Sequence, residues 1–101
     1  MHNNIDFDAG SSAAFQAKLD TGIQDVFTEL NRMEVEISRC RAWWKGGSEE
    51  SFIQSFRKTR KRIEKDLKNC MDDYKKMVRD VQRDKEREEA DISRAVRNAT
   101  Q

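Results

Sequence analysis

One stretch interrupts the helical character of this sequence, residues 43–48, which read WWKGGS. The chain of 101 residues contains no proline, and two of its four glycines lie here. Glycine adopts positive φ without steric cost, so a Gly-Gly pair between helical runs predicts a helix end and a chain reversal. Ser48 is a suitable N-cap for the next helix, and Glu49 and Glu50 follow in the first turn, where the helix dipole favours negative charge. The stretch therefore predicts the closed end of a helical hairpin, filled by the two tryptophans, with Trp44 against the start of the second helix near Phe52.

A regular heptad pattern precedes this interruption. Its apolar positions, alternately four and three residues apart, are Leu19, Ile23, Val26, Leu30, Met33, Ile37, Cys40 and Trp44. Phe27 lies one position from this row and widens the apolar stripe, which favours a helix with more than one neighbour, as in a four-helix bundle. The first helix is expected over residues 12–43, with Ser11 or Ser12 as its N-cap.

The second helix repeats the pattern and is expected over residues 48–97. Its row is Ile53, Phe56, Arg60, Ile63, Leu67, Cys70, Tyr74, Met77 and Val81. Arg60 alone interrupts the apolar character, and Phe52 faces the same side. Cys40 and Cys70 lie on these rows and are interpreted as buried thiols acting as small hydrophobes. From residue 82 to 91 eight of ten residues are charged, so the end of this helix has little to pack against.

The lengths of the two helices favour a dimer. At 1.5 Å per residue the first is about 48 Å long and the second about 73 Å, so the second overhangs its partner. A hairpin of two helices cannot bury so wide a stripe, and chains this small commonly oligomerise. We therefore expect an all-α, single-domain chain over residues 1–101, an antiparallel helix–turn–helix hairpin that dimerises into a four-helix bundle. The two apolar heptad rows given above are expected to form the core of the hairpin and the interface of the dimer.

Catalytic and metal-binding patterns are not found in the sequence. His2 is the only histidine and has no neighbours of suitable spacing, and the two cysteines match no zinc pattern. The pair Gly46-Gly47 lacks the strand and the Lys-Ser pair of a phosphate loop. We expect no enzyme activity, cofactor, metal or small-molecule substrate. No apolar run approaches the roughly 18 residues of a membrane span, and residues 1–10 lack the features of a Sec signal peptide.

One basic cluster occupies residues 57–68, with seven positive and two negative charges. Such a cluster can contact phosphates. Residues 1–43 carry four positive and seven negative charges, so the first helix can complement the second. The cluster has no interleaved aromatic residues, and a solvated or internally paired face is favoured over a nucleic-acid site.

The tripeptide Trp44-Lys45-Gly46 at mid-chain, with Ser48 two residues on and Phe52 eight residues after the tryptophan, resembles the WXG family. These are small secreted proteins of type VII (ESX) secretion systems, and the resemblance covers the whole chain. It implies a hairpin that forms a four-helix bundle as a homodimer or as a heterodimer with a related hairpin. It also implies export without a signal peptide, with the secretion ATPase as a further partner.

The export signal of this family lies near the C-terminus, and here the match is partial. Its common form is a tyrosine followed four residues later by an acid, but Tyr74 is followed at that distance by Val78. A broader form requires a hydrophobe, an acid at +4 and hydrophobes at +7 and +11. This chain supplies Lys85 at the first position and then Glu89, Ile92 and Val96, which share one helix face. The missing tyrosine motif and the two cysteines suggest the branch found in Gram-positive Firmicutes.

Three functions are compatible with these patterns. The first is a secreted effector or co-secreted partner of a type VII system that acts through helical surfaces. The second is a cytoplasmic targeting chaperone that pairs with a larger toxin. The third is an intracellular coiled-coil protein that binds nucleic acid through residues 57–68.

Overall fold

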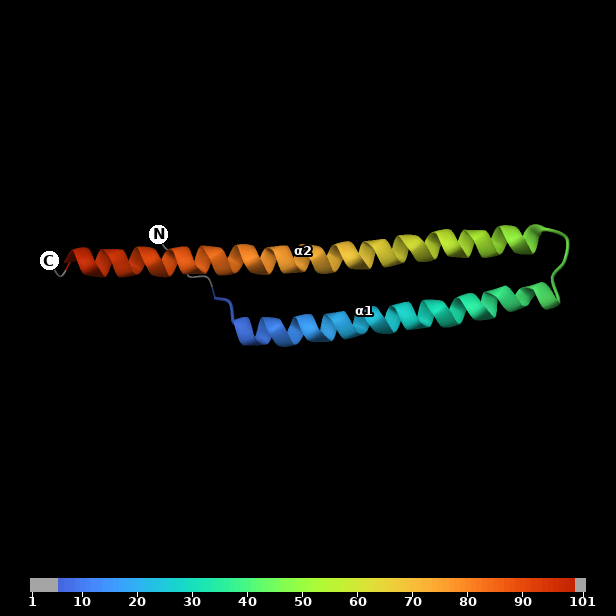
Figure 1. The fold of residues 1–101 in the computed structure, drawn as a ribbon, viewed down its shortest axis with the longest axis horizontal. Coiled ribbons are helices and arrows are strands. Elements are labelled where there is room, and N and C mark those ends of the chain that lie inside the picture. The colour runs from blue at the N-terminus through green and yellow to red at the C-terminus, as the bar shows by residue number, and fades with distance from the viewer. Residues whose placement is uncertain (1–5, 100–101) are drawn as a thin grey trace.

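The computed structural model describes residues 6–99, which form two antiparallel helices (Figure 1). Helix α1 (Ala9–Ser38) continues into a 3-10 turn, η1 (Arg39–Ala42), and helix α2 (Ser48–Ala99) returns alongside it. The molecule measures 85 × 20 × 15 Å, so it is a slender rod two helices wide. The all-helical hairpin expected from the sequence is confirmed.

The first helix begins earlier than expected because its cap is an aspartate. Asp8 has an extended backbone (φ −94°, ψ 110°), and its Oδ1 accepts the backbone N–H of Ser11 at 2.8 Å. This hydrogen bond lowers the pKa of the Asp8 carboxyl. The prediction of Ser11 or Ser12 as the cap is therefore wrong. Ser12 is instead buried, and its hydroxyl lies 2.5 Å from the hydroxyl of Tyr74 on α2.

Two left-handed glycines make the reversal at the closed end. After η1 the backbone N–H of Trp44 donates to the carbonyl of Cys40 at 2.8 Å. Gly46 and Gly47 then have φ of +117° and +101°, a region that L side chains rarely adopt. Ser48 is the first residue of α2 rather than the residue before it, so the predicted N-cap is displaced by one position. The Glu49 carboxylate caps the turn by accepting the N–H of Gly47 at 2.8 Å.

The buried core of the hairpin is narrow. Its apolar members are Ile23, Leu30, Cys40, Ile53 and Met71. On α2 the residues turned toward α1 include Met71 and Val78, each one position after a member of the predicted row. Cys70 is consequently exposed, which corrects the expectation that both thiols are buried. Helix α2 is rotated so that part of its apolar row faces away from α1.

The second helix is longer than the first and extends past it. At the open end the Lys85 ammonium donates to the carbonyl of Phe7 at 3.2 Å. Beyond that contact α2 projects past the start of α1 (Figure 1), and residues 89–99 are all exposed. Neither helix, over residues 6–99, has the length and apolar character that a bilayer crossing needs.

Candidate protein-interaction surfaces

Aromatic side chains form the tip of the hairpin. Trp44 packs against Phe52 with ring centroids 5.9 Å apart, as predicted, and its indole N–H donates to the Ser48 hydroxyl at 3.0 Å. Trp43 stacks on Trp44 at 6.1 Å but leaves 76% of its surface exposed. Lys45 is also exposed. The tip therefore combines a fixed Trp44 with an accessible second indole.

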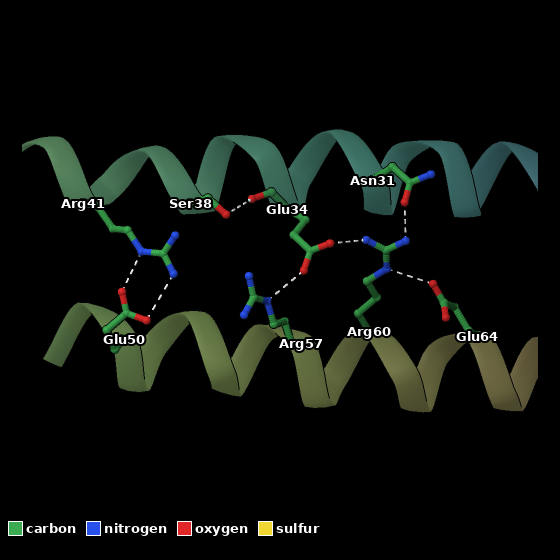
Figure 2. Close-up of polar contacts among 8 residues, drawn as sticks. All are labelled: Asn31, Glu34, Ser38, Arg41, Glu50, Arg57, Arg60 and Glu64. Carbon is green, nitrogen blue, oxygen red and sulfur yellow. Dashed lines mark hydrogen bonds and ion pairs between the residues drawn. The ribbon is translucent and has the colours of Figure 1, made fainter. Parts of the chain in front are cut away.

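An ion pair joins the two helices just below the tip. The Arg41 guanidinium contacts both carboxylate oxygens of Glu50, at 2.6 and 3.1 Å (Figure 2). This bidentate contact lowers the pKa of Glu50 and raises that of Arg41. Both side chains are about half exposed, so the pair mainly orients the chain reversal rather than stabilising it strongly.

One side of the hairpin, which we call the apolar flank, carries apolar residues of both helices that the hairpin does not bury. Helical spacing places them on the same side of the contact line between α1 and α2. They are Phe15, Leu19, Val26, Met33, Phe56, Ile63, Cys70 and Met77. Phe15 and Met77 are 53% and 64% exposed, and they line a groove of about 650 Å³ together with Leu19, Cys70, Tyr74 and the polar residues Asp66, Asn69 and Asp73. The flank is therefore an apolar surface with acidic residues beside it.

The predicted seam residues divide between the hairpin contact and this flank. The buried ones are Ile23 and Leu30. The half-buried ones are Leu19, Ile37, Phe56, Ile63, Leu67 and Tyr74. The exposed ones are Val26, Met33 and Met77. The contact within one hairpin thus uses only part of the heptad pattern.

A cluster of charged side chains crosses the middle of the hairpin (Figure 2). Glu34 of α1 accepts from Arg57 at 2.9 Å and from Arg60 at 2.5 Å. Arg60 also donates to Glu64 at 2.8 Å and to the side-chain oxygen of Asn31. The Arg60 side chain is only 17% exposed, and the hydrogen bond to Glu64 is the main reason that its pKa is raised. We call Glu34, Arg57, Arg60, Glu64 and Asn31 the polar cluster.

Sequence reasoning missed the polar cluster, although a signal for it was present. Arg60 in an apolar row requires an acceptor on the opposite helix, because a buried unpaired charge is costly. Glu34 follows the buried Leu30 by four residues, so it lies on nearly the same face of α1. Matching Arg60 with Glu34, an acidic residue on the contact face of the first helix, would have identified this contact.

The side opposite the apolar flank contains a groove between the helices. Two overlapping hollows of about 510 and 590 Å³ share Asn31, Arg60, Lys61 and Glu64. We call their union the lysine groove. Its lining residues are Phe27, Asn31, Glu34, Gln54, Arg57, Lys58, Arg60, Lys61, Glu64, Lys65 and Lys68. The basic cluster is therefore divided: Arg57 and Arg60 are paired internally, whereas the lysines are solvated.

The candidate export residues lie on the projecting end of α2. Ile92 and Val96 are 50% and 58% exposed, and Glu89 is exposed as well. Their spacing places all three on one helix face. The tail thus presents an apolar stripe beyond the last turn that α1 covers.

The remaining polar candidates do not gather into a site. His2 lies outside the described residues. Within residues 6–99 no group of three histidine, cysteine or acidic side chains is placed to hold a metal ion. Cys40 is buried, Cys70 is exposed, and both are free thiols.

Comparison with known proteins gives no match to a family model, to a curated protein or to a solved structure.

Proposed function

We propose that this protein is a small secreted substrate, or co-secreted partner, of a type VII (ESX-like) secretion system. In this proposal it works through its surfaces and performs no catalysis. The observation that carries the proposal is the placement of Trp44-Lys45-Gly46 at the reversal of a two-helix hairpin. Gly46 has a positive φ there, and Trp44 packs on the start of α2. This is the arrangement that the resemblance to the WXG family implies.

The apolar flank supports a dimer as the working form. Val26, Met33 and Met77 are 38–64% exposed, which is unfavourable for a chain that remains a monomer in water. Packing two such flanks together removes them from water and gives a four-helix bundle. A related hairpin with a similar flank could take the place of the second copy.

The projecting end of α2 supports a separate role in export. Ile92 and Val96 are exposed on a segment that the hairpin does not need for its own packing. Tyr74 is not available as the common signal, since its hydroxyl contacts Ser12 and Val78 lies four residues later. We therefore propose Glu89, Ile92 and Val96 as the docking face for the secretion machinery.

The test is detection of the protein in culture supernatant of the producing strain and of a strain lacking the secretion ATPase. We expect the protein outside the cells only when the ATPase is present, with a cytoplasmic protein as the lysis control. Equal amounts in both supernatants would contradict secretion by this route.

The second candidate is a targeting chaperone for a larger toxin, with the apolar flank covered by a helical segment of that toxin. The exposed flank favours this function as well, because it accepts any helical hairpin of matching width. Copurification of the tagged chain with a larger helical protein, combined with its retention in the cytoplasm, would distinguish the chaperone from the secreted substrate.

A further inference from the structure

Four lysines form a straight cationic edge along α2. Lys58, Lys61, Lys65 and Lys68 follow one another at spacings of three, four and three residues, so they lie on one face of the helix. The stripe is about 15 Å long at 1.5 Å per residue. All four are exposed, and none forms an ion pair with another residue of the range 6–99. The lysines are therefore free to bind an anionic partner.

The opposite edge of the lysine groove is neutral and partly apolar. Phe27 and Asn31 lie four residues apart on α1 and line the groove opposite the lysines. Phe27 is half-buried, and Asn31 is exposed. Between the two edges the polar cluster satisfies its own charges, since Glu34 and Glu64 accept from Arg57 and Arg60. The groove thus has one cationic edge, one apolar edge and a neutralised floor.

We propose that the lysine groove binds an acidic amphipathic helix of another protein, lying lengthwise between α1 and α2. Its acidic residues at heptad spacing face the four lysines, and its apolar residues contact Phe27. The groove lies on the side opposite the apolar flank, so the helix and a second hairpin can bind at the same time. The proposal goes beyond the secretion function and does not depend on it.

A helix fits this groove better than a nucleic acid does. Binding of single strands relies on several aromatic rings that stack on successive bases, whereas the groove lining contains one ring, the half-buried Phe27. The apolar edge has no counterpart on a phosphate backbone, whereas it matches the apolar stripe of an amphipathic helix.

The experiment uses the full chain and a synthetic helical peptide with glutamates at i, i+3, i+7 and i+10 and leucines on the adjacent stripe. Binding is measured by fluorescence anisotropy and located by amide chemical shifts of the labelled protein. We expect the shifts to concentrate at residues 27–35 and 54–68. We expect Lys61→Glu/Lys65→Glu to weaken binding of the peptide about tenfold, because the change replaces attraction by repulsion at two exposed charge contacts.

The matched control is Lys18→Glu/Lys76→Glu, which makes the same change in net charge at two exposed positions outside the groove lining. We expect less than about a twofold effect from it. Circular dichroism checks that each variant remains helical.

Four results would overturn the proposal. The first is equal binding of a scrambled peptide of the same composition, and the second is shifts located on the apolar flank. The third is tighter binding of duplex DNA than of the peptide with the same dependence on Lys61 and Lys65, which would assign the lysines to nucleic acid. Failure of the designed peptide to bind at all would equally reject an acidic helix as the partner.

Discussion

Gly46 shows how one residue determines the reversal of the chain. A Cβ at this position would meet no atom within 4 Å, so the only obstacle to a side chain is the backbone φ of +117°. We predict that Gly46→Val lowers the free energy of unfolding by about 1–3 kcal/mol, the usual range for a residue forced into a disfavoured region. Denaturant unfolding at fixed protein concentration measures it.

The matched control for this prediction is Gly22 in the middle of α1. A methyl group added there would also meet open space, but the backbone of Gly22 is helical. Gly22→Ala should therefore raise stability by about 0.5–1 kcal/mol. An equal loss of stability in both variants would contradict the assignment of the cost to positive φ.

Arg60 is the residue at which a charge replaces an apolar core position. We predict that Arg60→Ala lowers the free energy of unfolding by about 1–3 kcal/mol, because Glu34, Glu64 and Asn31 lose hydrogen bonds in a partly buried place. Arg32→Ala is the comparison, since Arg32 pairs with Glu29 on the surface with 73% of its side chain exposed. That variant should change stability by less than about 0.5 kcal/mol. Similar losses of stability in both variants would show that the polar cluster contributes no more than an exposed ion pair.

At the scale of residues, the sequence predicted the residues of the chain reversal better than the N-cap residues of the helices. The Gly-Gly reversal and the contact of Trp44 with Phe52 follow from local rules and are confirmed. The caps were displaced because several polar residues compete at each helix start. Asp8 precedes Ser11 and Ser12, and which of them caps α1 depends on how Ser12 meets Tyr74 across the hairpin. That contact joins residues 62 positions apart and is invisible to local pattern reading.

At the scale of elements, the rotation of α2 is the feature that the sequence predicted wrongly. A row through Cys70 and Met77 is more apolar than a row through Met71 and Val78, which also contains Arg57 and Glu64, so periodicity alone favours the first row. The structure turns the second row toward α1. The same orientation of α2 lets Arg57 and Arg60 pair with Glu34 of α1. These ion pairs lie on the side of the hairpin opposite the apolar flank. It leaves Cys70 and Met77 on the apolar flank.

The end of α2 is the element whose role is most separable from folding. We predict that a chain ending after residue 86 has a free energy of unfolding within about 0.5 kcal/mol of that of the full chain, because residues 89–99 are exposed and make no contact with α1 that buries them. The same truncation should abolish export. In the full chain, backbone amides near Ile92 and Val96 should exchange with solvent faster than those near Leu67 and Met71.

Two measurements check the role of this segment, namely hydrogen exchange of the purified protein and immunodetection in the supernatant. Ile92→Asp/Val96→Asp serves as the point-mutant version. Ala90→Asp/Asn98→Asp adds the same charge to the other face of the same exposed segment and should leave export unchanged. Normal export of the truncated chain would remove these residues from the proposed docking face.

At the scale of the whole molecule, shape and surface chemistry together favour a dimer. The rod is two helices wide and buries few of its apolar side chains completely. Its two sides differ, because the apolar flank lacks a partner whereas the lysine groove contains a satisfied polar cluster. A second hairpin laid on the apolar flank completes a four-helix section without covering the groove. The unit that folds stably is accordingly expected to be the dimer rather than the single chain.

Met33 and Val35 provide a matched test of that arrangement. Both are exposed apolar residues of α1, at 42% and 53%, but only Met33 lies on the apolar flank. We predict that Met33→Asp weakens dimerisation about 100-fold, because the two-fold symmetry places the change twice in the interface and each buried side chain contributes about 1.5 kcal/mol or more. Val35→Asp adds the same charge outside the flank and should leave the dimer intact. Sedimentation velocity over a range of concentrations measures both variants. If Val35→Asp dissociates the dimer and Met33→Asp does not, the two copies meet on the lysine-groove side, and the assignment of the two flanks is reversed.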